Sequence, residues 1–258
     1  MQVSESARPL QGRTALVSGG GNGLGASMAR TLDAAGARVV LTGRTLDKLE
    51  QVAAELGGRP RVETVDVSDA TQVAALADRL LDERIDVLVN NAGIAGPVAP
   101  LVEIEPEQWD EVFDINVRGV YLMCRAFLPP MLERGEGDVI NVASVSGKRP
   151  LIRRTPYCAS KMALIGLTQT LAFEVSPQGV RVNTLSPGPV EGERMDRNFR
   201  MEGERTGAGY HAAKETFVSR AALGRMVTED EVAAAVLAML QMPGMTGADV
   251  DLSGGMIA

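Results

Sequence analysis

The sequence predicts an α/β protein in which helices cover both faces of a doubly wound parallel sheet. Short runs rich in Val, Leu and Ile alternate along the chain with longer segments of helical period, and such alternation implies crossover connections between parallel strands. Glycine is abundant, at 28 residues, whereas aromatic residues make up 3% of the chain. This composition suits tight turns and cores of branched aliphatic side chains, as doubly wound folds require.

Each element is expected from its local pattern. Strands are predicted where β-branched and aliphatic residues form short runs, at 14–18, 38–42, 62–65, 87–90, 138–143, 180–186 and 249–252. Helices are predicted where apolar residues recur at helical spacing, at 24–35, 45–57, 71–83, 106–133, 157–175 and 228–241. The stretch 187–223 is rich in Glu, Arg, Met and Gly without a clear strand. We expect a long irregular connection there, with a lid over the ligand site at 189–222.

Size and composition limit the classes of protein that fit. The 258 residues, 45% of them hydrophobic, suit one domain over 1–258. A net charge of −7 disfavours nucleic acid as a partner. No apolar run reaches the roughly 20 residues that span a bilayer, and 1–13 lack the apolar core of a signal peptide, so we expect a cytoplasmic protein. With two cysteines, Cys124 and Cys158, and a single histidine, His211, we expect no disulfide framework and no metal site.

A glycine-rich loop follows the first expected strand and opens into a helix. It comprises Ser18, Gly19, Gly20, Gly21, Asn22, Gly23, Leu24 and Gly25. Glycines let the backbone approach a ligand closely, and the helix N-terminus adds unpaired N–H groups and a partial positive charge. The loop can therefore hold a phosphate group. Its spacing differs by one residue from the general dinucleotide fingerprint, and the lack of a Gly-Lys-Ser/Thr run excludes a P-loop.

Tyr157 and Lys161 lie four residues apart, so one helical turn places a phenol and an ammonium on the same face. The nearby positive charge stabilises a phenolate, and such a phenol can donate or accept a proton near neutral pH. The same spacing is common on solvated helix faces. The significance of the pair therefore depends on the other motifs of the chain.

Those motifs follow one another in a fixed order: the glycine loop, Asn90-Asn91-Ala92-Gly93, Asn116, Ser144, Tyr157, Lys161 and Pro187-Gly188. With them the sequence resembles the short-chain dehydrogenase/reductase family over nearly its whole length, and Ser144 stands 13 positions before Tyr157, as the family pattern requires. The resemblance implies a Rossmann-type fold. It also implies an NAD(P)-dependent oxidoreductase that transfers a hydride between a nicotinamide cofactor and a secondary alcohol or ketone.

The resemblance assigns roles to individual residues. Tyr157 is the implied general acid/base, and Lys161 assists it and hydrogen-bonds the nicotinamide ribose. Ser144 is implied to donate to the reacting oxygen, and Asn116 to hold a water that links Lys161 to solvent. The residues implied to contact the cofactor are Ser18, Gly19, Asn22, Gly23, Leu24, Gly25, Arg44, Asp66, Val67, Asn91, Ala92, Gly93, Tyr157, Lys161, Pro187, Gly188 and Val190.

The choice of cofactor depends on the end of the second expected strand. An NAD enzyme of this family would usually carry a carboxylate at about position 43, which here is Gly43. Gly43 leaves room for a phosphate, and Arg44 supplies a charge-assisted partner worth about 1.5–3 kcal/mol. The sequence therefore favours NADP(H), with NAD(H) as the alternative. A basic residue in place of Asn22 would have strengthened this preference.

Four cations, Lys148, Arg149, Arg153 and Arg154, precede the helix that carries Tyr157. Such a cluster could bind an acidic substrate through an Arg fork, or it could be a solvated loop or a subunit contact.

The resemblance also implies a homotetramer, with a dimer as the next choice. Two other functions stay open: a catalytically silent dinucleotide-binding regulatory protein, and a transferase that binds S-adenosylmethionine in the glycine loop. Neither accounts for the combination of Ser144, Tyr157 and Lys161.

Overall fold

The computed structural model describes residues 8–256, apart from the side chain of residue 194, and centres on one parallel sheet of seven strands. The ends of the expected domain, 1–7 and 257–258, lie outside the described residues. The sheet order is β3-β2-β1-β4-β5-β6-β7. The strands are β1 (Thr14–Ser18), β2 (Arg38–Gly43), β3 (Arg61–Thr64), β4 (Val87–Asn90), β5 (Gly137–Val142), β6 (Val180–Pro187) and β7 (Asp249–Leu252). The order reverses between β1 and β4, as in a doubly wound fold.

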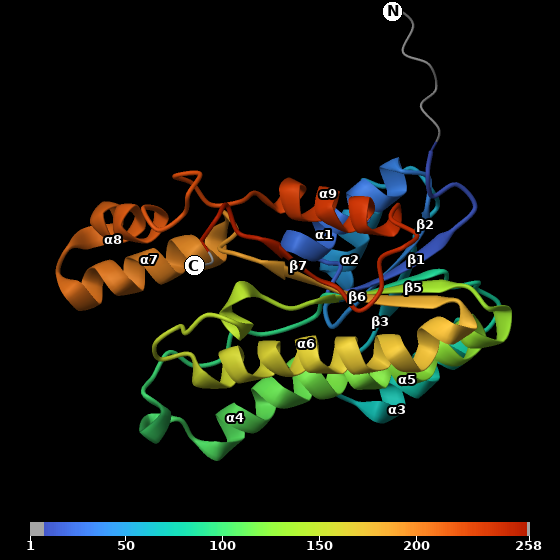
Figure 1. Ribbon diagram of the computed structural model, residues 1–258, viewed down its shortest axis with the longest axis horizontal. Helices are drawn as coiled ribbons and strands as arrows, with labels where there is room; N and C mark the ends of the chain where they lie inside the picture. The colour runs from blue at the N-terminus through green and yellow to red at the C-terminus, as the bar shows by residue number, and fades with distance from the viewer. Residues whose placement is uncertain (1–7, 257–258) are drawn as a thin grey trace, which may run out of the picture.

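Helices cover both faces of this sheet (Figure 1). One layer contains α1 (Gly23–Ala34), α2 (Leu46–Ala53) and α9 (Glu229–Leu240). The other contains α3 (Ala70–Arg79), α4 (Pro106–Phe113), α5 (Gly119–Arg134) and α6 (Thr155–Val175). The predicted α/β class is confirmed. Within residues 8–256, no helix is both long enough and apolar enough to cross a bilayer.

Alternation along the central strands builds one core on each face of the sheet. In β1, Ala15 and Val17 are buried with α1 and α9, whereas Leu16 is buried with α3 and α5 on the opposite face. All three side chains are fully buried, as a strand covered on both faces requires. The two cores hold the carboxyl ends of the strands in place. The functional residues come directly after these strand ends in the sequence.

The helix expected over 106–133 has an interruption. A π-helical turn at Asp114–Arg118 separates α4 from α5, and Asn116 lies within this turn. A π turn accommodates one more residue than an α turn, so it changes which face of the helix each following residue occupies. At the start of α5, Gly119 fits closely against Val67, because a Cβ at Gly119 would lie 2.8 Å from Val67 Cγ2.

The expectation of an irregular connection at 187–223 is wrong, because most of it is helical. The chain forms α7 (Glu193–Thr206) and α8 (Gly209–Val218), which extend together beyond the end of the sheet where β6 finishes (Figure 1). A small third core holds the pair together, with Met195 and Phe199 from α7 against Phe217 from α8. The apolar residues of α7 and α8 are few and lie among many charged residues, so the helical period was weak in the sequence. A parallel bridge between Val190 and Val227 joins the two ends of this segment.

Candidate active site

The glycine loop has the backbone geometry that its residues predicted. Gly19 and Gly23 have φ values of +68° and +50°, a region that favours glycine. A Cβ at Gly25 would lie 2.1 Å from the carbonyl oxygen of Gly19, so only glycine fits at the start of α1. The loop therefore leaves its backbone open to a ligand at the N-terminus of α1.

Hydrogen bonds join this loop to the segment after β4. Ser18 Oγ accepts from the backbone N–H of Asn91 at 3.0 Å and of Ala92 at 3.1 Å. The Asn91 side chain donates back to the Ser18 carbonyl at 3.0 Å. Ser18 is thus a buried support of the loop, and the two segments form a single wall at the carboxyl ends of β1 and β4.

Two adjoining cavities run along this edge of the sheet. The larger, of about 700 Å³, is lined by Gly19, Asn22, Gly23, Leu24, Gly25, Asn91, Ala92, Gly93, Tyr157, Lys161, Pro187, Gly188 and Val190, among others. The second, of about 300 Å³, shares Gly19, Asn22, Ala92 and Gly93 with it and adds Arg44, Asp66 and Val67. Of the expected cofactor residues, Ser18 alone lies behind the wall. The cavities cross the point where the strand order reverses, as a dinucleotide site requires.

Ser144, Tyr157 and Lys161 come together at one end of the larger cavity. Ser144 follows β5, where its Oγ accepts from Ser146 N–H at 3.1 Å and lies 3.4 Å from the Pro187 carbonyl oxygen. Lys161 is 5% exposed, and its ammonium donates to the Val142 carbonyl at 2.8 Å. The same ammonium lies 5.8 Å from the centre of the Tyr157 ring. The sequence-predicted pair therefore faces the cavity beside a hydroxyl group.

Asn116 is fully buried beneath the residues that follow Gly93. Its Oδ1 accepts from Ile94 N–H at 2.8 Å, and its Nδ2 donates to the Ile94 carbonyl at 2.9 Å and to Ser160 Oγ at 3.0 Å. A Cβ at Gly93 would lie 3.0 Å from Asn116 Oδ1 and 3.6 Å from Lys161 Nζ. Both polar atoms therefore border the space at Gly93.

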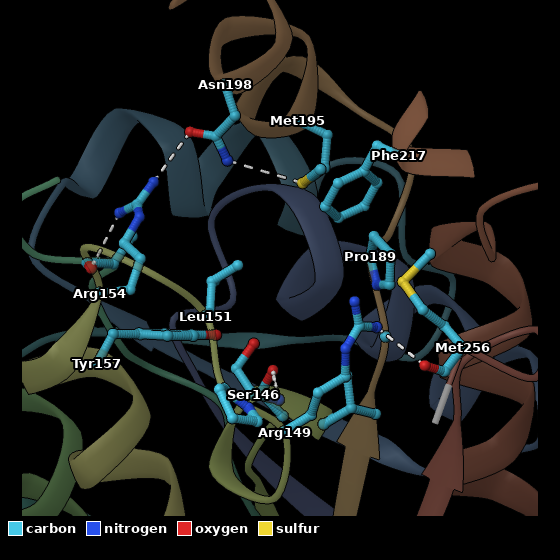
Figure 2. A pocket seen from close by; sticks show the side chains of 15 residues that line it. Ser146, Arg149, Leu151, Arg154, Tyr157, Pro189, Met195, Asn198, Phe217 and Met256 are labelled. Carbon is cyan, nitrogen blue, oxygen red and sulfur yellow. Dashed lines mark hydrogen bonds between the residues drawn. The ribbon is translucent and has the colours of Figure 1, made fainter. Parts of the chain in front are cut away.

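A third, smaller pocket of about 80 Å³ adjoins the larger cavity and shares Ser144, Tyr157 and Gly188 with it. Figure 2 shows the Tyr157 hydroxyl pointing into this pocket. Met195 and Asn198 of α7 and Phe217 of α8 approach from the opposite side (Figure 2). Because Ser144 and Tyr157 face both spaces, they can contact two different ligands at once.

The four cations before α6 do not form one site. Lys148 pairs with Asp251 and with Asp249, the latter at 2.8 Å. Arg153 donates to the Val98 carbonyl at 3.3 Å. Arg154 donates to the carbonyls of Ala95 and Gly96 and to Asn198 of α7. Of the four, Arg149 and Arg154 line the small pocket.

Sequence reasoning missed several residues of the site. Lys48, in the first turn of α2, lines the 300 Å³ cavity together with Arg44. Its position in the first turn of the helix that directly follows Arg44 was the available signal. Glu229, the first residue of α9, lines the larger cavity, and a Cβ at Gly23 would lie 3.4 Å from its Oε1. Burial raises the pKa of Glu229 above its usual value.

Neither cysteine is arranged as a reactive group. Burial raises the pKa of the Cys124 thiol to about 12, and that thiol lies 3.4 Å from Asn90 Nδ2. Burial also raises the pKa of Cys158, next to Tyr157, which disfavours its thiolate. Among the described residues, no group of three or more His, Cys, Asp or Glu side chains could hold a metal ion.

Comparison with known proteins identifies the family of this chain. Residues 13–203 match the family model described as short chain dehydrogenase. The chain is 38% identical over 253 residues to D-threitol dehydrogenase of Mycolicibacterium smegmatis, with 95% of this chain and 93% of the relative covered. It also matches the structure of an actinorhodin polyketide ketoreductase variant with NADPH at a TM-score of 0.90, 31% identity and 95% and 97% coverage. NAD⁺-bound xylitol dehydrogenase matches at a TM-score of 0.90, 27% identity and 95% and 99% coverage. The chain therefore belongs to the short-chain dehydrogenase family.

Proposed function

We propose that this protein is an NAD(P)-dependent oxidoreductase that interconverts a secondary alcohol and a ketone. One observation carries the proposal: Ser144 and Tyr157 line both the long cavity and the small pocket. A dinucleotide fits the long cavity, where a glycine loop that excludes side chains meets a helix N-terminus. A bound nicotinamide would supply the hydride donor or acceptor. The substrate would then lie in the small pocket, against the same two side chains.

The positions of the four catalytic candidates support the following roles. Tyr157 exchanges a proton with the substrate oxygen, and Ser144 donates a hydrogen bond that stabilises charge on that oxygen. Lys161 holds a buried positive charge beside the phenol and favours its ionised form. Asn116 fixes Ile94 and leaves one lone pair of Oδ1 facing the space at Gly93, where a water could link Lys161 to solvent.

Substitution of Tyr157 tests this function directly. Tyr157→Phe removes the proton donor but keeps the ring, so we expect turnover to fall by about 10²- to 10⁴-fold with little change in cofactor affinity. Lys161→Ala should damage both turnover and cofactor binding. Tyr121→Phe, on the exposed face of α5, is the matched control and should behave as the wild type. The assay follows reduced nicotinamide by absorbance over a panel of alcohols and ketones. A protein that binds cofactor yet turns over no member of the panel would indicate a regulatory role instead.

We also propose NADP(H) as the preferred cofactor. Arg44 and Lys48 line the same cavity as Asp66 and Val67, and no carboxylate occupies position 43. Two cations near the ribose that carries the 2′-phosphate in NADP(H) would favour that cofactor. Each charge-assisted hydrogen bond to the phosphate would contribute about 1.5–3 kcal/mol to binding.

Cofactor titrations would check this preference. Arg44→Ala and Lys48→Ala should each weaken NADPH binding by about 10- to 100-fold and leave NADH binding nearly unchanged. Gly43→Asp should favour NADH, and a Cβ at Gly43 would meet Leu49 at an ordinary 3.4 Å. Tighter binding of NADH than of NADPH by the wild type would overturn the proposal.

The segment 189–222 is proposed as a substrate lid, because α7 and α8 contribute Met195, Asn198 and Phe217 to the small pocket.

A homotetramer is proposed as well. The outer face of α6 exposes apolar side chains, including Met162 at 48% and Phe173 at 86%. Sedimentation of the wild type and of Phe173→Glu tests the assembly, since a charge at this contact should dissociate it.

A further inference from the structure

The small pocket contains a positive charge that the proposed proton-transfer chemistry does not use. Arg149 lines the pocket with Ser144 and Tyr157, and Figure 2 shows its guanidinium rising between Ser146 and Pro189. Its Nη1 donates to the Met256 carbonyl at 2.9 Å, which holds the group in place. Among residues 8–256, that carbonyl is the one acceptor within hydrogen-bond distance of the Arg149 guanidinium. The edge formed by Nε and Nη2 therefore keeps its donors for a ligand.

The surroundings of this guanidinium favour an anion. No aspartate or glutamate is among the described residues that line the pocket, and most of the lining is apolar, including Leu151, Met195, Phe217 and Met256. Charge attraction is stronger in such surroundings than in open water. Arg154, the second cation of the lining, is engaged by the carbonyls of Ala95 and Gly96 and by Asn198.

The other two cations of the 148–154 segment are engaged elsewhere. Lys148 pairs with Asp249 and Asp251, and Arg153 donates to the Val98 carbonyl. Arg149 is thus the cation of this segment that faces both the pocket and the reacting groups with donors to spare. Its Nε and Nη2 edge matches the spacing of two carboxylate oxygens, so one carboxylate can accept both hydrogen bonds.

We propose that Arg149 binds the carboxylate of the substrate, and that the substrate is a short hydroxy acid or the corresponding oxo acid. This inference depends on the proposed oxidoreductase function. In the oxidation direction, a bound oxidised nicotinamide would accept the hydrogen of the alcohol carbon as hydride, and the hydroxyl proton would pass to Tyr157. A ketone and a reduced nicotinamide would result. The pocket, at about 80 Å³, suits a small acid whose carboxylate reaches Arg149 while its oxygen lies at Tyr157 and Ser144.

The experiment compares short oxo acids with their methyl esters, with neutral ketones and with phosphorylated ketones of equal length. For the wild type we expect kcat/KM to favour the acids by about 10- to 100-fold, as a charged hydrogen-bonded pair allows. Arg149→Met should lose this preference through a higher KM and keep its activity on the esters. Arg149→Lys should recover part of it, since a lysine charge lacks the fork. Lys148→Met is the matched control and should leave the preference unchanged.

A binding measurement supports the kinetic one. A short carboxylic acid that cannot be turned over should raise the melting temperature of the wild type in the presence of cofactor, but not that of Arg149→Met. Equal kcat/KM for acids and neutral ketones, or an acid preference that survives in Arg149→Met, would overturn the carboxylate site while leaving the oxidoreductase function intact. A preference for phosphorylated ketones would overturn the carboxylate assignment. Lack of turnover on every compound would instead count against the proposed function.

Discussion

Replacement of Asn116 by alanine tests whether this side chain supports the active site through the hydrogen bonds described above. Three hydrogen bonds would be lost, two to the backbone of Ile94 and one to Ser160. At about 1 kcal/mol each, the free energy of unfolding should fall by about 3 kcal/mol. For a chain of this size, that loss corresponds to a melting temperature lower by about 6–12 °C.

A second buried asparagine provides the control. Asn141, also fully buried, accepts from Asn90 at 2.8 Å and donates to Thr168 at 2.8 Å, and it is not among the lining residues of the three cavities described above. Asn141→Ala should therefore cost about 2 kcal/mol and leave kcat nearly unchanged. Asn116→Ala should lower kcat by at least about tenfold, equivalent to 1.4 kcal/mol in the barrier.

Thermal unfolding and steady-state kinetics on the two variants, at a temperature where both are folded, separate stability from catalysis. The reasoning fails if the two variants lose turnover equally, since kcat would then follow general destabilisation. It also fails if Asn116→Ala unfolds at the wild-type temperature, because the three hydrogen bonds would then contribute nothing.

Three further predictions concern single side chains. Gly93→Ala places a methyl group 3.0 Å from Asn116 Oδ1 and 3.6 Å from Lys161 Nζ. Turnover should therefore fall while the melting temperature barely changes. Turnover at the wild-type rate would argue against a proton path between these two groups. Burial raises the pKa of Glu229, and its ionised form opposes a bound pyrophosphate, so NADPH affinity should fall as pH rises through that raised pKa. Glu229→Gln should bind NADPH more tightly at neutral pH and lose this dependence, as calorimetric titration at several pH values can measure. Arg225, whose guanidinium lies 2.6 Å from Glu231, lowers the pKa of this carboxyl from 4.5 to about 2. The contribution of Glu231 to stability is therefore present above pH 4.5 and lost as pH falls toward 2. Denaturant titrations of the wild type and Glu231→Gln should therefore differ at neutral pH and converge in acid.

The features that sequence predicted best are those fixed by neighbouring residues. Tyr157 and Lys161 share a helix face because of their spacing alone. The glycine content of the loop likewise predicts its backbone geometry. The positions of the strands were equally clear, because buried parallel strands are continuous apolar runs. These local signals were enough to predict the fold class, and the family resemblance implied the residues around the long cavity.

Features that depend on distant partners were not predictable. The helices α7 and α8 are stabilised by a few apolar residues, such as Met195 and Phe199, set among many charges, so their period was weak. The four cations before α6 looked alike in sequence. Their acceptors lie far along the chain, at Asp249 for Lys148 and Met256 for Arg149, and only the fold shows which cation faces the pocket. Lys48 is a different case, because its signal was local: it lies in the first turn of the helix that follows Arg44.

The π turn at Asp114–Arg118 makes the active site sensitive to chain length at a point where no residue contacts a ligand cavity except Ile115. One residue of an α-helix corresponds to a rotation of about 100°. If this stretch kept all its residues in a regular α-helix, α5 would have to rotate by that amount relative to α4 and to its own core. The π turn absorbs the extra residue, so both helices keep their buried faces. Deleting Val117 would restore a regular α turn and keep the phase of the two helices, but it would move Asn116 away from the backbone of Ile94, which it holds through two hydrogen bonds.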